Sequence, residues 1–103
     1  MKDKIKNIAI QIKEEANKMS DNKLRDYFLS HFEGENVQSV KSITSDDIFH
    51  IVNNDFVFQI RNNVKFCPIH EVPAKVLLNQ KNLKQVFIVN FLENEVVFKE
   101  VNK

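Results

Sequence analysis

The chain is poor in glycine, proline and cysteine: its 103 residues include one Gly, two Pro and one Cys. Close backbone approach to a phosphate needs residues without a side chain, so Gly34 alone cannot form a dinucleotide-binding fingerprint or a P-loop. A single Cys excludes an internal disulfide and a cysteine-rich zinc module. We therefore expect no cofactor.

The sequence also lacks a long apolar run and an excess of charge of one sign. No apolar stretch approaches the roughly 20 residues of a membrane span, and the N-terminal stretch is too interrupted by charge for a signal peptide. Fifteen basic against fourteen acidic residues give a net charge of +1, which excludes a histone-like or polyacidic protein. The length suits one domain, residues 1–103. We expect it to be cytoplasmic and not bound to a membrane.

The first third of the chain is expected to form a helical hairpin, with helices over residues 3–19 and 21–33. Apolar residues of the first helix recur at three- and four-residue spacing: Ile5, Ile8, Ala9, Ile12, Ala16 and Met19. Ser20 is a suitable N-cap for the second helix. Gly34 suits the position after that helix, because glycine adopts the left-handed conformation without strain.

The rest of the chain is rich in Phe and Val and predicts strands. Residues 55–61 alternate in polarity, and 64–67 are expected to return after a turn at Asn62 and Asn63. Residues 86–91 and 95–101 are expected to close a C-terminal hairpin. The predicted fold class is α+β, with the N-terminal helical hairpin packed on an antiparallel sheet of about four strands.

Two segments remain open between helix and strand. In residues 44–52, Thr44 and Asp47 resemble a capping box at the start of a helix, whereas the apolar residues that follow would equally suit a strand. In residues 73–80, Pro73 either interrupts the sheet or occupies the first position of a helix.

Metal binding and cysteine chemistry have little support. Cys67 and His70 have the spacing of half a zinc site, but His31 and His50 each stand alone and no second Cys exists. No catalytic signature surrounds Cys67. We expect Cys67 to pack as a small hydrophobic residue, with no metal and no catalytic role; an enzyme with a site at Cys67 and His70 is the third hypothesis.

One pattern is similar to that of metal-dependent nucleases, which pair an acidic residue with a strand-borne acid-x-Lys. Asp46, Asp47 and Asp55 precede a predicted strand that carries Gln59 and Arg61. Gln and Arg stand where the pattern has an acid and Lys, and helix capping would also explain the first two Asp residues. The match is therefore weak.

The preferred hypothesis is a non-enzymatic module that binds and blocks a protein, such as an immunity protein, an antitoxin or a phage-encoded inhibitor. Residues 34–60 carry one basic and four acidic groups, and such a surface can steer a charged partner, for example a toxin or a nucleic-acid enzyme. The predicted acidic face comprises Glu33, Glu35, Asp46, Asp47 and Asp55. The oligomeric state stays open.

The alternative is a small nucleic-acid-binding or regulatory domain. Lys75, Lys81 and Lys84 lie in an acid-free stretch rich in Asn and Gln, which predicts a loop that contacts phosphates. Against it, thirteen Lys accompany only two Arg in the chain, which is a poor supply for reading bases.

Overall fold

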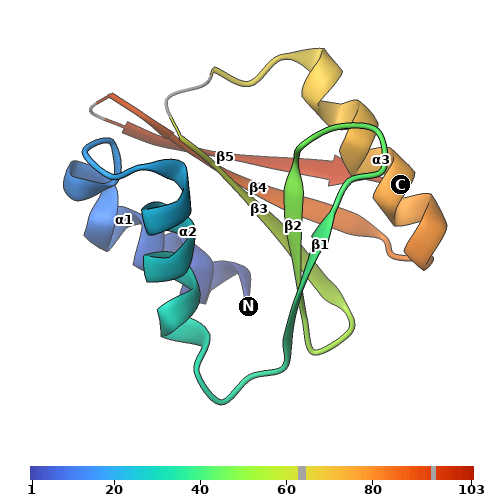
Figure 1. Ribbon diagram of the computed structural model, residues 1–103, viewed down its shortest axis with the longest axis horizontal. Coiled ribbons are helices and arrows are strands. Elements are labelled where there is room, and N and C mark those ends of the chain that lie inside the picture. Colours follow the sequence, from blue (N-terminus) through green and yellow to red (C-terminus); the bar gives the residue numbers. More distant parts are fainter. Residues whose placement is uncertain (63–64, 94) are drawn as a thin grey trace.

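The computed structural model describes residues 1–62, 65–93 and 95–103 (Figure 1). The helical elements are α1 (Lys2–Ala16), α2 (Asp21–Leu29), the 3₁₀ turns η1 (Ser30–Phe32) and η2 (Pro68–His70), and α3 (Glu71–Lys81). The strands are β1 (Val37–Lys41), β2 (Ile48–Val52), β3 (Phe56–Asn62), β4 (Gln85–Leu92) and β5 (Glu95–Asn102). The α+β class is confirmed, and so is the N-terminal helical hairpin packed on the sheet.

The local signals of the hairpin act as expected. The Ser20 hydroxyl accepts a hydrogen bond from the Lys23 backbone N–H at 3.3 Å, which caps α2. Gly34 has φ +90, the left-handed conformation. Both helices are shorter than predicted, because α1 ends at Ala16 and the last turn before Gly34 is the 3₁₀ turn η1.

The sheet has five strands in the order β1-β2-β3-β4-β5, and it is mixed. Strands β3 and β4 pair in parallel and the other neighbours are antiparallel, so the expectation of about four antiparallel strands is corrected. A parallel pair needs a crossover connection, and the segment from η2 through α3 supplies it. Residues 73–80 are thus helical, with Pro73 in the first turn of α3. The N–H groups of a first turn have no partner within the helix, so proline, which lacks this group, costs no hydrogen bond there.

The bounds of the strands test two further sequence predictions. Residues 48–52 form β2, so the helix considered for 44–52 is wrong. Residues 65–67 are not in a strand, because the chain leaves the sheet there to enter η2. The rest of the 64–67 strand and the turn at Asn63 fall outside the described residues. The C-terminal hairpin of β4 and β5 is confirmed.

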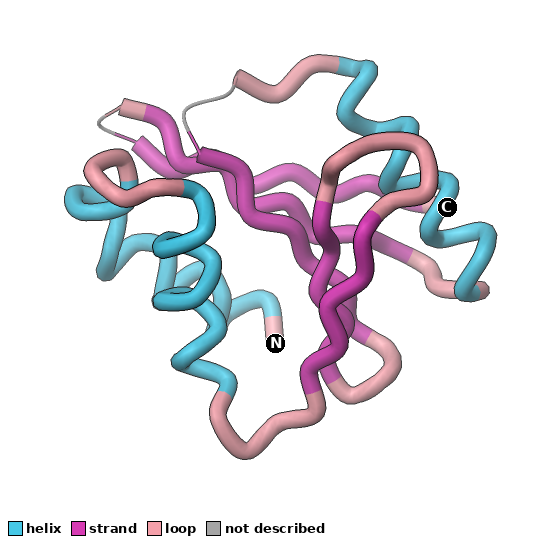
Figure 2. The backbone as a smooth tube through the Cα atoms, viewed as in Figure 1, coloured by secondary structure: helices cyan, strands magenta, loops and turns pink. Residues whose placement is uncertain are grey.

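The helices cover opposite faces of the sheet and create two cores. On one face α1 and α2 bury a cluster that contains Ile12, Phe28 and Phe58. On the other face α3 buries Leu77 and Leu78 against strand residues such as Phe49. Strand β4 is buried on both faces from Val86 to Phe91, as its uninterrupted apolar run predicts. Figure 2 shows α3 separated from the N-terminal helices by the strands.

None of the helices in the described ranges has the length and apolar composition that a membrane crossing requires.

Truncation of α1 on its buried side should destabilise the protein strongly. Ile12 is 2% exposed, whereas Ile10 on the same helix is 54% exposed. We expect Ile12→Ala to lower the free energy of unfolding by about 2–5 kcal/mol, and the matched Ile10→Ala to change it by less than about 0.5 kcal/mol. Urea denaturation of the two variants checks this, and equal midpoints would contradict the assignment of the core.

Candidate functional site

A pocket opens where β2 separates from β3. The two strands pair only from His50↔Phe58 to Val52↔Phe56, although β3 continues to Asn62 beside β4. Beyond His50, β2 stays with β1 and the β1–β2 hairpin turns away from the other strands (Figure 1). The gap contains a pocket of about 160 Å³. Its lining comes from the 42–47 turn, from β2 and β3, and from α2.

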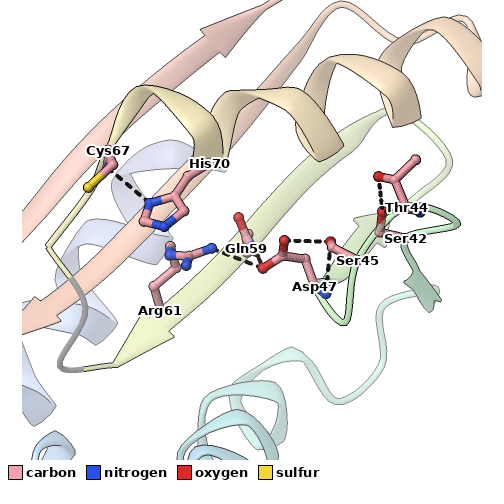
Figure 3. A network of polar contacts seen from close by, with 8 residues as sticks. All are labelled: Ser42, Thr44, Ser45, Asp47, Gln59, Arg61, Cys67 and His70. Atoms are coloured by element: carbon pink, nitrogen blue, oxygen red, sulfur yellow. Dashed lines mark hydrogen bonds and ion pairs between the residues drawn. The ribbon is translucent and has the colours of Figure 1, made fainter.

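Three polar side chains meet across this gap. Gln59 Nε2 donates to Asp47 Oδ1 at 3.0 Å, and Arg61 Nη1 forms an ion pair with the same oxygen at 2.9 Å (Figure 3). The Ser45 hydroxyl donates to the other carboxylate oxygen at 2.7 Å. The Arg61 side chain is only 12% exposed and Gln59 is 2% exposed. The trio of Asp47, Gln59 and Arg61 is therefore a partly buried, hydrogen-bonded unit. All three residues belonged to the nuclease-like pattern, which was a weak match.

Hydroxyl groups fix the turn that carries Asp47. Ser42 Oγ accepts from the Thr44 N–H at 3.1 Å, and Ser45 Oγ accepts from the Asp47 N–H at 3.3 Å. The Ser42 N–H also donates to the Asp47 carbonyl at 2.8 Å. These short-range bonds are typical of turns rather than helices. They hold the Asp47 carboxylate opposite the end of β3.

Among the residues that line the pocket, three buried side-chain atoms have no hydrogen-bond partner in the described structure: Gln59 Oε1, Arg61 Nε and Asn62 Oδ1. A buried donor or acceptor that is left unpaired costs about 1–3 kcal/mol. Native proteins contain few such groups, and those that occur need a reason. All three belong to residues within the last four of β3, two of which, Gln59 and Arg61, share one face of the strand.

Both arginines of the chain line this pocket. Arg61 projects from β3 and is held by Asp47. Arg25 comes from α2, is half-buried, and donates to Asn22 Oδ1 at 3.0 Å. Each guanidinium has five N–H donors, so both retain donors beyond these contacts.

His50 is a buried histidine in the wall of the pocket. It is 1% exposed and its Nδ1 lies 2.8 Å from the Ser39 hydroxyl. Burial, and secondarily the positive charge of Arg25, lowers the pKa of His50 to about 4. The imidazole is therefore neutral at pH 7 and adds no charge to the pocket.

Cys67 and His70 lie beside the trio at the start of α3 (Figure 3). The Cys67 N–H donates to His70 Nδ1 at 3.0 Å, which places the proton of the neutral ring on Nε2. Burial, and then the charge of Arg61, lowers the pKa of His70, while Asp47 opposes the shift. Cys67 is exposed, so its expected burial as a small hydrophobic residue is wrong: it caps η2 at the surface.

No group of three or more His, Cys, Asp or Glu is placed to hold a metal ion within the described ranges. His31 lies elsewhere, with its Nδ1 at 3.1 Å from the Tyr27 carbonyl oxygen. His50 faces Ser39 and the Phe58 ring. The four Cys and His residues considered in the sequence thus do not converge in the described structure.

The predicted acidic residues lie at both ends of the β1–β2 hairpin. Glu33, Glu35 and Asp55 lie at one end, where the Asn53 N–H donates to the carbonyl of Asn36. The other two, Asp46 and Asp47, occupy the turn at the opposite end, five residues or roughly 17 Å away. The structure therefore brings together two subsets and not the full set.

Several of these carboxylates already pair with cations. Glu35 accepts from Lys4 at 2.7 Å, and Asp46 lies 3.3 Å from Lys41. Asp47 is paired with Arg61 inside the pocket. As a surface for steering a partner, the acidic face is thus weaker than its residue count indicates.

The three lysines of the alternative hypothesis do not lie in one loop. Lys75 and Lys81 belong to α3, and Lys84 follows the helix. Lys75 lies 4.0 Å from Glu71 on the same helix. Helix α3 begins near Arg61 and extends for about 16 Å, so its last residue, Lys81, and Lys84 lie far from the pocket.

Comparison with protein-family models, curated proteins and solved structures finds no match for this chain.

The depressed pKa of His50 predicts that stability falls in acid. The unfolded chain takes up a proton at its pKa of 6.5, but the folded protein resists it until about pH 4. Stability is therefore fully present above pH 6.5 and decreases as the pH falls toward 4, by about 3 kcal/mol at about 1.4 kcal/mol per unit.

The measurement is urea denaturation at pH 7 and pH 4, compared with His50→Gln, which has no titrating ring. Carboxylates contribute equally to both proteins, so the difference between the two isolates His50. Parallel losses of stability in the wild type and the variant would contradict the prediction.

Proposed function

We propose that the protein binds single-stranded nucleic acid and that the pocket between β2 and β3 holds one nucleotide. The observation that carries this proposal is the position of the arginines. The chain uses Lys thirteen times and Arg twice, and both Arg residues line the same pocket.

Arginine and lysine differ in what they recognise. A guanidinium is a planar fork that donates to two oxygens of one phosphate, whereas an ammonium is a compact, strongly hydrated point charge. In a chain that supplies nearly all its positive charge with Lys, two Arg at one pocket favour a ligand with paired acceptors. Arg25, at the α2 side of the pocket, contacts the phosphate, while Arg61 is a donor whose orientation Asp47 fixes.

The place of the pocket in the sheet supports a ligand site. It lies at the carboxyl end of β3, which has a parallel neighbour on one side and a diverging antiparallel neighbour on the other. In open α/β sheets, ligands bind beyond the carboxyl ends of parallel strands, and here the carboxyl end of β3, one strand of the parallel pair, borders the pocket. A small pocket with a few convergent polar groups fits the same expectation.

The trio also limits what chemistry we propose. A metal-dependent nuclease needs carboxylate oxygens free to bind its cations. The trio contains one carboxylate, that of Asp47, and both of its oxygens accept hydrogen bonds. The proposed role is therefore recognition of a nucleotide without hydrolysis.

The protein-blocking hypothesis stays a prediction. Its acidic residues are divided between two ends of a hairpin, and three of the five are ion-paired. The geometry of the described residues favours the nucleic-acid class, at a site different from the three lysines.

Neutralising Arg25 should weaken binding uniformly across sequences. We expect Arg25→Gln to raise the Kd for a labelled single-stranded 12-mer of mixed sequence about tenfold, and to lower the salt slope by about one unit, because one phosphate contact is lost. The matched control is Lys81→Gln, which removes the same charge at the far end of α3 and should change the Kd by less than twofold. Fluorescence anisotropy between about 50 and 200 mM salt measures both.

If Lys81→Gln weakened binding of the 12-mer and Arg25→Gln left the Kd unchanged, the binding site would be at the lysines and not at the pocket. Failure of the wild type to bind any single-stranded DNA or RNA at low salt would reject the proposed function.

Arg61→Lys tests the fork itself. Lys keeps the charge next to Asp47 and so the ion pair, but it lacks the Nε donor and the planar geometry. We expect the thermal midpoint to change little while the Kd for the same 12-mer rises about tenfold. Unchanged binding would show that Arg61 serves the fold and not the ligand.

A further inference from the structure

We propose that two copies of the chain associate through strand β5, paired antiparallel about a two-fold axis at Val97. This inference is independent of the proposed function, because it concerns an edge of the sheet and not the pocket. It is carried by the direction in which the β5 backbone groups point and by the charges that the pairing brings together.

Strand β5 forms one edge of the sheet and runs for eight residues, Glu95–Asn102. Among the described strands it has a neighbour on one side only, β4. An edge strand carries a row of N–H and C=O groups that can pair with another chain. The opposite edge strand, β1, has five residues. Of the two edges, β5 therefore offers the longer row of backbone groups to an additional strand.

The pairing with β4 determines which β5 residues have outward backbone groups. The Lys103 N–H donates to the Lys84 carbonyl at 2.9 Å, and these two residues continue the β4–β5 register by one pair. Hydrogen-bonded and non-hydrogen-bonded pairs alternate along antiparallel strands. Odd-numbered residues of β5 therefore direct their N–H and C=O groups to β4, and even-numbered residues direct theirs to the open edge.

This alternation limits how two β5 strands can pair. Residues with outward groups must lie opposite one another, so the two-fold axis falls at a residue and not between two residues. An axis at Val97 places Glu95 of each copy opposite Lys99 of the other. An axis at Phe98 places Lys99 opposite Val97, and an axis at Lys99 places the two lysines opposite each other. Within β5, only the axis at Val97 pairs opposite charges, and it does so twice.

The side chains that this register pairs are exposed on one face of β5. Val97 is 37% exposed, and Glu95 and Lys99 are exposed as well. Neither charge belongs to an ion pair within the described part of the chain. Because their backbone groups bond to β4, these residues meet the second copy in non-hydrogen-bonded pairs, where side chains are closest. Opposite charges in such cross-strand pairs stabilise a sheet, and like charges destabilise it.

Helix α1 has an exposed apolar side chain near the same edge. Lys2 Nζ lies 2.6 Å from Glu100 Oε1. Lys6 Nζ lies 5.7 Å from the ring centre of Phe98, so α1 runs along β5. Four helix residues advance about 6 Å and two strand residues about 6.6 Å, which sets Ile10, the next in this row, level with the middle of β5. Ile10 is 54% exposed, and the two-fold axis places both copies of α1 on the same face of the joined sheet.

The dimer should be weak and reversible. Pairing over residues 95–99 buries a small area, and interfaces below about 1,200 Å² are typical of transient complexes. We expect a Kd of about 1–100 μM. Sedimentation equilibrium over this range should show the mass rising toward twice the 12.1 kDa of one chain.

Charge reversal at the paired positions tests the register. Lys99→Glu places glutamates opposite each other, and Glu95→Lys places lysines opposite each other, so each variant alone should raise the Kd at least about tenfold. In an equimolar mixture of the two variants each Glu again faces a Lys, and a heterodimer should form with a Kd close to that of the wild type. Thermal melts show that each variant is folded.

The matched control is Lys41→Glu on the opposite edge strand, β1, which should leave the Kd within twofold. A wild type that stays monomeric up to about 500 μM overturns the inference. It is also overturned if Lys41→Glu dissociates the dimer and Lys99→Glu does not, or if the mixed variants stay monomeric. These measurements contain no nucleic acid, so their failure leaves the proposed function to its own test.

Discussion

The parallel pairing of β3 with β4 is the constraint on which the rest of the arrangement depends. Two parallel neighbours require a crossover, and the chain makes it with α3 on the face that α1 and α2 leave open. Both central strands are then covered on two sides, and the sheet acquires two cores instead of one. The crossover also brings His70, at the entry to α3, next to Arg61 at the end of β3. One pairing thus determines the layers and also the surroundings of the pocket.

Much of the fold could be predicted because its signals are local. The apolar spacing of α1, the Ser20 cap and the alternation of β3 each reflect interactions between residues close in sequence. The parallel pair could not be predicted in this way, since it depends on contacts between strands about 30 residues apart. The crossover helix could not be predicted either, because Pro73 is equally compatible with a strand edge and with the first turn of a helix.

The site was predictable in part. Asp47, Gln59 and Arg61 all belonged to a weak nuclease-like pattern in the sequence. The separation of β2 from β3, which lets them meet around a pocket, cannot be inferred from the local sequence pattern. The exposure of Cys67 follows from its position at the cap of η2, which depends on the crossover. The scarcity of Arg was visible in the composition, yet its meaning required the finding that Arg25 and Arg61 line one pocket.

The near absence of glycine has a consequence for the denatured chain. Left-handed turn positions usually call for Gly, but of the four positive-φ residues in the described ranges three are Asn53, Asn54 and Asn82. Asparagine tolerates this conformation, and it has fewer accessible backbone states than glycine when the chain is unfolded. The backbone therefore loses less conformational entropy on folding at each of these Asn residues than it would at a glycine. The tight connections of this small domain gain part of their stability from the restricted freedom of the unfolded state, with no added contact in the folded one.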